Sequence, residues 1–237
     1  MEACACAGPP VASDYTPVGE IVNIDNVQTY VVGSSERAIV IIYDIFGFHN
    51  NTKQFCDKLS EMGFTVAMAD HFRGEPWSLE NFPPADFAAF QNWVAEKGSW
   101  DIVKTDLLRT VEHLREAKGC SKFGVLGFCW GGRNAMQAAA EPTFSACGTA
   151  HPAFLQDDYA EAAQAPLIFL PSGDDPPTDS IQAILDGKPF GDKCVYRRFD
   201  DMHHGWCAAR GDWAVPLQAQ RASEALQLFG DFYKANL

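Results

Sequence analysis

The stretch Gly127-Phe128-Cys129-Trp130-Gly131-Gly132 decides the fold that this sequence predicts. It follows an apolar run, residues 123–126, and precedes an alanine-rich helical pattern, so it marks a sharp turn from a strand into a helix. Such a Gly-x-nucleophile-x-Gly turn strains the backbone of its central residue, and its small residues let strand and helix approach closely. Cys129 therefore takes the place of a nucleophile at a helix N-terminus, where the helix dipole and free N–H groups favour a thiolate.

Apolar runs bounded by turn residues indicate the other strands of a buried sheet. Together with residues 123–126, they cover residues 38–43, 64–69, 146–150, 166–170 and 194–199. Helical patterns alternate with them, over about residues 52–62, 85–96, 101–118, 131–140, 178–185 and 215–234. The alternation predicts an α/β fold with a mostly parallel central sheet and helices on both faces. Two short alternating runs, residues 19–25 and 27–32, predict an antiparallel hairpin at the sheet edge.

The length and composition favour a single domain. The chain has 237 residues, a common length for one α/β domain, and 47% of them are hydrophobic. We expect this domain to span residues 19–237, after a flexible N-terminal segment of residues 1–18. That segment contains Cys4 and Cys6, but two thiols alone do not complete a metal site, and no metal is predicted.

Charge and hydropathy limit the class of partner. The formal net charge of −13 repels phosphate backbones and anionic lipids, so neither nucleic acid nor a membrane is an expected partner. No run reaches the roughly 18 apolar residues of a membrane helix, and the first residues lack the basic and apolar regions of a signal peptide. We therefore expect a soluble cytoplasmic protein, as a monomer or a homodimer.

A cysteine nucleophile needs a base within hydrogen-bond reach, and on a nucleophile-elbow fold the acid and then the histidine follow it along the chain. Asp174 and Asp175 follow the run at 166–170, and His203 and His204 follow the run at 194–199. Both pairs lie just past the carboxyl ends of predicted parallel strands, where open α/β sheets place their sites. The residues alone leave open which aspartate is the acid and which histidine is the base.

Other groups are expected at the same edge. The backbone N–H groups of Ile45 and Trp130 are candidates for stabilising an oxyanion. Asp44, at the end of a predicted strand, either caps the following turn or takes part in the chemistry. His151 and Trp206 are candidates for lining the pocket.

Four short motifs together resemble the dienelactone hydrolase family of α/β-hydrolases. The resemblance covers the chain from about Gly19 to the end and implies an α/β-hydrolase fold. The motifs are Asp44-Ile45-Phe46-Gly47, Asp70-His71-Phe72-Arg73-Gly74, the stretch at 127–132 and His204-Gly205-Trp206.

The resemblance also implies a role for individual residues. It makes Cys129 the nucleophile, His204 the base and Asp175 the acid. The family has an acidic residue, commonly glutamate, at the position of Asp44, where it hydrogen-bonds the resting thiol until substrate arrives. Arg73 matches a position at which family members hold the carboxylate of dienelactone.

Arg210 is a candidate for a second such arginine. A Cys-His-Asp triad on this fold implies a carboxylic ester hydrolase that cleaves small esters or lactones through a thioester acyl-enzyme, with no cofactor. Its partner is then a small-molecule ester or lactone. One alternative keeps the site but acts on another electrophile, such as a thioester or a phosphoester. The other is a non-catalytic or redox-sensing relative in which Cys129 is oxidised.

Overall fold

The computed structural model describes residues 8–237, so Cys4 and Cys6 lie outside the described residues. The described residues form one eight-stranded sheet in the order β1-β2-β4-β3-β5-β6-β7-β8. The strands are β1 Glu20–Ile24, β2 Val27–Val32, β3 Arg37–Ile42, β4 Thr65–Ala69, β5 Lys122–Phe128, β6 Ala146–Ala150, β7 Leu167–Leu170 and β8 Val195–Tyr196. Strand β2 pairs antiparallel with β1 and β4, and every other pair is parallel. The predicted mostly parallel sheet and its edge hairpin are confirmed.

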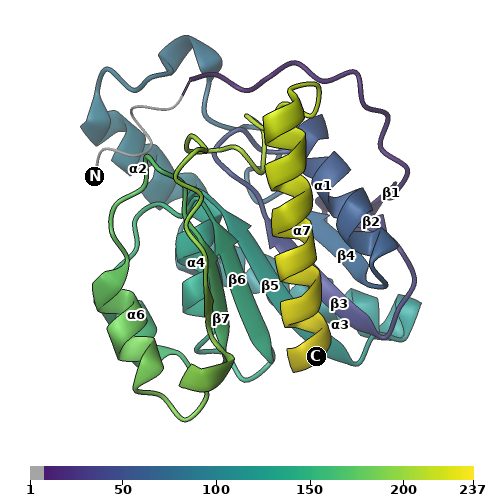
Figure 1. Ribbon diagram of the computed structural model, residues 1–237. Coiled ribbons are helices and arrows are strands. Elements are labelled where there is room, and N and C mark those ends of the chain that lie inside the picture. The colour runs from purple at the N-terminus through teal and green to yellow at the C-terminus, as the bar shows by residue number, and fades with distance from the viewer. Residues whose placement is uncertain (1–7) are drawn as a thin grey trace.

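Helices cover both faces of this sheet (Figure 1). The α-helices are α1 Asn50–Glu61, α2 Phe87–Lys97, α3 Trp100–Lys118, α4 Trp130–Ala138, α5 Asp157–Ala162, α6 Asp179–Asp186 and α7 Pro216–Asn236, and two short 3-10 turns are η1 Leu79–Asn81 and η2 Gly191–Lys193. Helices α1 and α7 contact each other on one face, and α3 and α4 pack together against the strands on the other. In Figure 1, the yellow α7 runs in front of the sheet, from its upper edge downward.

Two elements differ from the sequence-based expectation. The strand predicted over 194–199 is regular only at β8, because beyond Tyr196 the chain keeps isolated backbone hydrogen bonds to the end of β7, such as Phe199 N to Pro171 O at 2.9 Å. Helix α5 was not predicted. Its six residues are fewer than two helical turns, which is too short for a helical repeat to stand out in the sequence.

The central strands are buried in the core, and this positions the carboxyl edge of the sheet. All residues of β3 from Ala38 to Ile42 are fully buried, as are the central residues of β5 and β6. The carboxyl ends of the parallel strands β3, β5, β6 and β7 lie at one edge, because neighbouring strands share direction and register. The loops that follow these strands therefore meet there.

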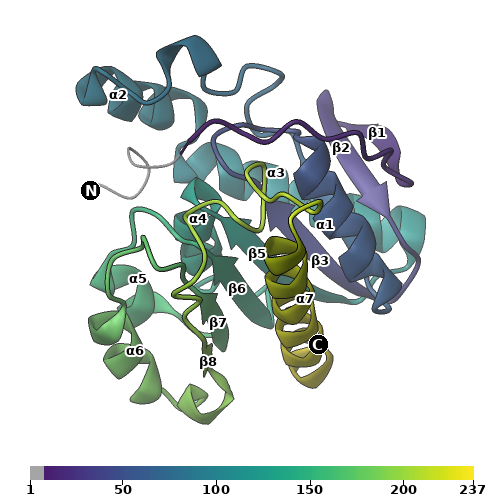
Figure 2. The ribbon, with the colours of Figure 1, turned by 45° about the horizontal axis from the view of Figure 1, so that its top comes forward.

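Residues 8–18, which were expected to be part of a flexible segment, contain no helix or strand but are hydrogen-bonded to the domain. Val11 N lies 3.0 Å from the carbonyl oxygen of Ala209. Tyr15 Oη and Val18 N donate to the Asp57 carboxylate at 2.8 and 3.0 Å. Figure 2 shows these residues, in purple, crossing the molecule from the side of α2 to β1. Over residues 8–237, no helix combines the length and the apolarity needed to cross a membrane.

Candidate active site

Cys129 sits on a strained turn between β5 and α4. Its backbone angles are φ 53° and ψ −116°, in a region that non-glycine residues rarely adopt, and its side chain is almost fully buried. The flanking glycines permit this turn by their lack of a side chain. A Cβ at Gly127 would lie 2.0 Å from the carbonyl oxygen of Gly131, and a Cβ at Gly131 would lie 2.2 Å from that of Ile42. Strand and helix therefore approach so closely that only glycine fits.

A buried imidazole and a buried carboxylate are paired beside this turn. His204 Nδ1 lies 2.5 Å from Asp175 Oδ1, and the other oxygen, Oδ2, accepts the backbone N–H of Ser172 at 2.6 Å. Asp175 thus holds one ring nitrogen of His204, which leaves Nε2 for the thiol. The other two candidates for the acid and the base, Asp174 and His203, bond only to the backbone of His204. Asp174 accepts the N–H of His204 at 3.0 Å, and His203 Nδ1 bonds the His204 carbonyl oxygen at 2.9 Å.

The side chains of Cys129 and His204 interact electrostatically and by a hydrogen bond. Burial opposes protonation of His204, but the charge of Cys129 and the hydrogen bonds of the ring with Asp175 and Cys129 outweigh it and raise the pKa of His204 to about 10. A charged imidazole next to the sulfur favours the thiolate form of the cysteine. The pair therefore has the electrostatics of an activated nucleophile.

Asp44 lines the same pocket and is fully buried against two backbone donors. Its Oδ1 accepts the N–H of Phe46 at 2.9 Å, and its Oδ2 accepts the N–H of Ala209 at 3.0 Å. Burial raises the pKa of Asp44 to about 6, although both hydrogen bonds favour the ionised carboxylate. Asp44 therefore caps the turn after β3 and lines the same cavity as Cys129, and its part in the chemistry stays a prediction.

The backbone amides of Ile45 and Trp130 are available as donors at this site. Ile45 N follows the end of β3, and Trp130 N belongs to the first residue of α4, where a helix leaves its N–H groups without intrahelical partners. Within residues 8–237, neither amide donates a backbone hydrogen bond outside the regular elements. Their role in binding an oxyanion stays a prediction.

The space next to Cys129 is a cavity of only about 10 Å³. Its walls include Phe46 and Phe82, whose ring centroids are 5.3 Å apart, and Arg210. A cavity of this size barely holds one water molecule, so the space next to the sulfur is narrow. Among residues 8–237, no three His, Cys, Asp or Glu side chains are grouped to hold a metal ion.

Comparisons with known proteins show the family of this chain. The family model described as the dienelactone hydrolase family matches residues 27–237. This chain belongs to the dienelactone hydrolase family. An uncharacterized AIM2 family protein of Schizosaccharomyces pombe is 31% identical over 224 residues, which cover 91% of this chain and 90% of that protein. The carboxymethylenebutenolidase homolog of Homo sapiens is 31% identical over 124 residues, about half of each chain.

Solved structures share the fold. A dienelactone hydrolase from Klebsiella pneumoniae superposes with a TM-score of 0.67 at 18% identity and covers 89% of this chain and 98% of its own. An esterase from Pyrococcus furiosus gives a TM-score of 0.63 at 16% identity, covering 96% of this chain and 95% of its own. The fold is therefore the α/β-hydrolase fold, and family and fold together support a hydrolase.

The two arginines singled out from the dienelactone hydrolase resemblance lie in different surroundings. Arg73 donates two hydrogen bonds to the buried Asp106 carboxylate, both at 2.8 Å, and His71 Nδ1 lies 3.0 Å from the same group. Its guanidinium is thus held by the protein itself and does not line the cavity at Cys129. Arg210 does line that cavity, and it also donates to the carbonyl oxygen of His204.

The other two pocket candidates are buried side chains. Trp206 is fully buried and packs on Phe199, with ring centroids 4.6 Å apart, so it belongs to the core and not to the wall of the cavity. His151 is also fully buried, between the rings of Phe128 at 5.7 Å and His204 at 5.2 Å. Burial and the nearby His204 hold the pKa of His151 well below its usual value. His151 is therefore a neutral neighbour of the paired imidazole.

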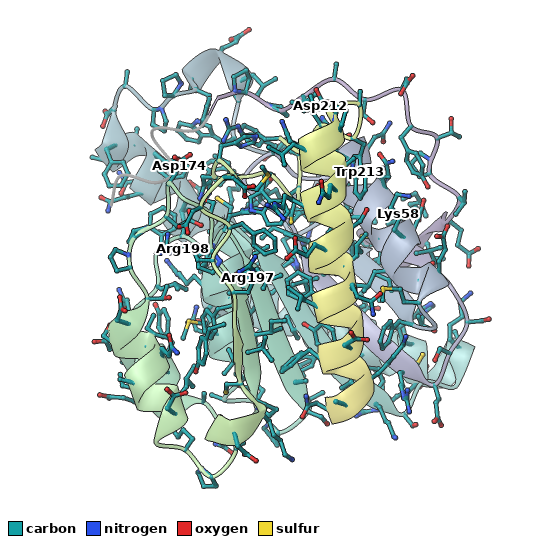
Figure 3. The ribbon with its side chains drawn as sticks, in the orientation of Figure 1. Lys58, Asp174, Arg197, Arg198, Asp212 and Trp213 are labelled. Atoms are coloured by element: carbon teal, nitrogen blue, oxygen red, sulfur yellow. The ribbon has the colours of Figure 1, made fainter. Side chains whose placement is uncertain are left out.

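Arg198 is a residue that the sequence did not single out. Its guanidinium donates to the carbonyl oxygens of Ser172 at 2.5 Å, Asp175 at 3.0 Å and Pro176 at 2.8 Å, so it holds the loop that carries Asp175. Figure 3 shows Arg198 and Asp174 near each other, to the left of the upper part of α7. No pattern of residue types identifies this role, because the partners are backbone carbonyls.

Proposed function

We propose that this member of the dienelactone hydrolase family is a carboxylic ester hydrolase that cleaves small esters or lactones. The proposal rests above all on His204, which is paired with Asp175 through one nitrogen and interacts with the thiol of Cys129. A nucleophile, a base and an orienting acid in this order, on an α/β-hydrolase fold, are the parts of an acyl-transfer site.

In the proposed mechanism, His204 holds the proton of the Cys129 thiol and the thiolate attacks the ester carbonyl carbon. The N–H groups of Ile45 and Trp130 stabilise the resulting oxyanion. As the tetrahedral intermediate collapses, His204 gives its proton to the departing alcohol or enol oxygen, and a thioester to Cys129 remains. Water, deprotonated by His204, then attacks the thioester and releases the acid and the thiol.

The cysteine nucleophile favours a particular range of esters. A thiolate is a better leaving group than an alkoxide, so a tetrahedral intermediate at Cys129 expels the thiolate again unless the ester has a good leaving group. Activated esters and enol lactones meet this requirement. Lactones are compact esters of this kind, because their leaving oxygen stays attached to the acyl part.

The test combines turnover with mapping of the covalent intermediate. Purified protein is assayed with p-nitrophenyl acetate, and the acylated peptide is identified by mass spectrometry after rapid acid quench. We expect a burst of p-nitrophenol and an acetyl group on Cys129, and both should disappear in Cys129→Ala. Cys194→Ala, at a half-buried thiol between η2 and β8, is the matched control and should retain activity. Unchanged turnover in Cys129→Ala would refute the assignment.

A further inference from the structure

His151 is a buried titratable residue that the proposed mechanism does not use. It directly follows β6, and its side chain is fully buried. Neither ring nitrogen has a hydrogen-bond partner within residues 8–237. A neutral imidazole carries one N–H donor and one acceptor nitrogen, so both of these groups are buried unpaired. Their burial is unfavourable, and an apolar ring would fill the same space without that cost.

The backbone of His151 is also in an unfavourable conformation. Its φ is 38°, in the left-handed region that residues with a Cβ rarely adopt. Hydrogen bonds on both sides enforce it: His151 N donates to Leu170 O at 2.9 Å, Cys129 N to Ala150 O at 3.4 Å and Ala153 N to Cys129 O at 2.9 Å. Such strain clusters at functional sites, so this residue points to a function beyond packing.

The ring of His151 lies between the base and the residue before the nucleophile. It is edge-on to the ring of His204, with centroids 5.2 Å apart and an interplanar angle of 69°. On the other side it stacks on Phe128, with centroids 5.7 Å apart and an angle of 26°. His151 does not line the cavity at Cys129. Any effect on the chemistry therefore passes through His204.

The charges around the two rings favour a neutral dipole at this place. The charged and ionisable groups that act on the rings are Cys129, Asp44, Asp174, Asp175, His203 and Arg210. Burial, and after it the charge of His204, holds the pKa of His151 low, so His151 stays neutral beside an imidazolium. The buried imidazolium of His204 has lost its hydration, and a fixed dipole stabilises such a charge in place of water.

Resting on the proposed function, we propose that His151 is a positioning residue whose neutral imidazole stabilises the charged form of the Cys129–His204 pair. Its dipole replaces part of the hydration that His204 loses on burial, so the thiol gives its proton to His204 more readily. No covalent step passes through His151, and the proton moves only between Cys129 and His204. A phenyl ring of similar shape would keep the packing but lack the dipole.

The test follows the thiolate through the rate at which iodoacetamide alkylates Cys129 as a function of pH, with Cys129→Ala as the background. We expect His151→Phe to raise the midpoint of this profile by about one pH unit, so that the rate below both midpoints falls about tenfold. His151→Asn, which is polar and tolerates a positive φ, should recover part of the shift. His113→Phe makes the same exchange at a half-buried histidine of α3 and should leave the midpoint unchanged.

Equal midpoints in wild type and His151→Phe would overturn the inference, and so would equal shifts in His151→Phe and His151→Asn. A second measurement needs no variant to fold: in NMR spectra of the wild type, the carbon-bound ring protons of His151 should not titrate between about pH 5 and pH 9. Titration in that range would overturn the inference too. A wild-type protein that hydrolyses no ester would refute the proposed function instead, and the alkylation profiles would still decide the role of His151.

Discussion

Asp175 and His204 form a pair in which Oδ1 and Nδ1 lie 2.5 Å apart, and both side chains are almost completely buried. The pair comes from loops that follow two different strands, β7 and β8, so the sheet fixes its geometry. Asp175 accepts a second bond from the N–H of Ser172, which leaves it no freedom to rotate away from the ring. The carboxylate thereby fixes the orientation and tautomer of the imidazole.

The first prediction separates the two adjacent aspartates. Asp175→Asn should lower kcat for an activated ester by about 10³- to 10⁴-fold, because an amide favours the wrong tautomer of His204. Asp174→Asn keeps an acceptor oxygen for the backbone N–H of His204 and should lower kcat far less. Steady-state kinetics of both variants, with circular dichroism to verify folding, show which aspartate orients His204. Equal losses would mean that Asp175 has no special role.

The second prediction concerns the charge of His204. Apart from burial, which opposes it, the charge of Cys129 is the largest influence that raises the pKa of His204 to about 10. Cys129→Ser lacks a thiolate and should therefore lower this pKa markedly, as measured by the pH titration of the imidazole carbon-bound protons in NMR spectra. Cys194→Ser is the control and should leave the pKa of His204 unchanged. An unchanged pKa in Cys129→Ser would show that Asp175 alone sets the charge.

The interaction of His204 with Cys129 also affects the stability of the fold. Because the folded pKa of His204 lies above its ordinary value of 6.5, the pair contributes stability that is complete below pH 6.5 and is lost as the pH rises through about 10. The unfolding free energy of wild type should therefore fall relative to that of Cys129→Ser as the pH rises from 6.5 to about 10. Chemical denaturation at a series of pH values measures the difference directly.

The sequence predicted the elements that carry strong local patterns. The elbow at Cys129 could be predicted because it needs glycine at 127 and 131, where a Cβ would lie only 2.0 and 2.2 Å from a backbone oxygen. The parallel strands were visible because buried strands are almost uniformly apolar. The order of nucleophile, acid and histidine predicted that the candidate residues lie at the carboxyl edge of the sheet, and the structure pairs Asp175 with His204 there.

Other features depend on tertiary contacts that no local pattern reports. Trp206 lies in the core, although it follows His204 by only two residues, because side-chain direction in an irregular loop is set by packing. Arg73 is bound by Asp106 of α3, which lies 33 residues further along the chain. Arg198 acts on backbone carbonyls, which every residue possesses. Sequence alone could not distinguish these arginines from solvated ones.

The third prediction concerns Asp44, whose folded pKa of about 6 lies above its ordinary value of 3.8. Between these values the folded protein binds a proton that the unfolded chain has released, so this group makes stability fall as the pH rises. Relative to Asp44→Asn, wild type should lose about 2 to 3 kcal/mol of unfolding free energy from pH 4 to pH 7. Urea denaturation of both proteins measures this difference.

The variant also loses a hydrogen bond, since an amide cannot accept from both Phe46 and Ala209. That loss is the same at every pH and does not affect the comparison of slopes. Parallel stability curves for wild type and Asp44→Asn would contradict a raised pKa at Asp44.

The fourth prediction treats Arg198 as a positioning residue for Asp175. Arg198→Met removes three hydrogen bonds from the loop between Ser172 and Pro176, so Asp175 should lose its fixed place beside His204. A misplacement of about 1 Å lowers a rate about 10²-fold, and we expect a fall of this order in kcat with little change in KM. The unfolding free energy should fall by about 1 to 3 kcal/mol.

A purely structural role for Arg198 is tested by a second readout. The proton between His204 and Asp175 should give a downfield NMR signal in the wild type, and this signal should broaden or vanish in Arg198→Met. Arg197→Met is the matched control, because Arg197 pairs with the half-buried Glu224 at 3.5 Å and has no hydrogen bond to the Asp175 loop. If Arg198→Met loses stability but keeps both the signal and kcat, Arg198 supports the fold without positioning Asp175.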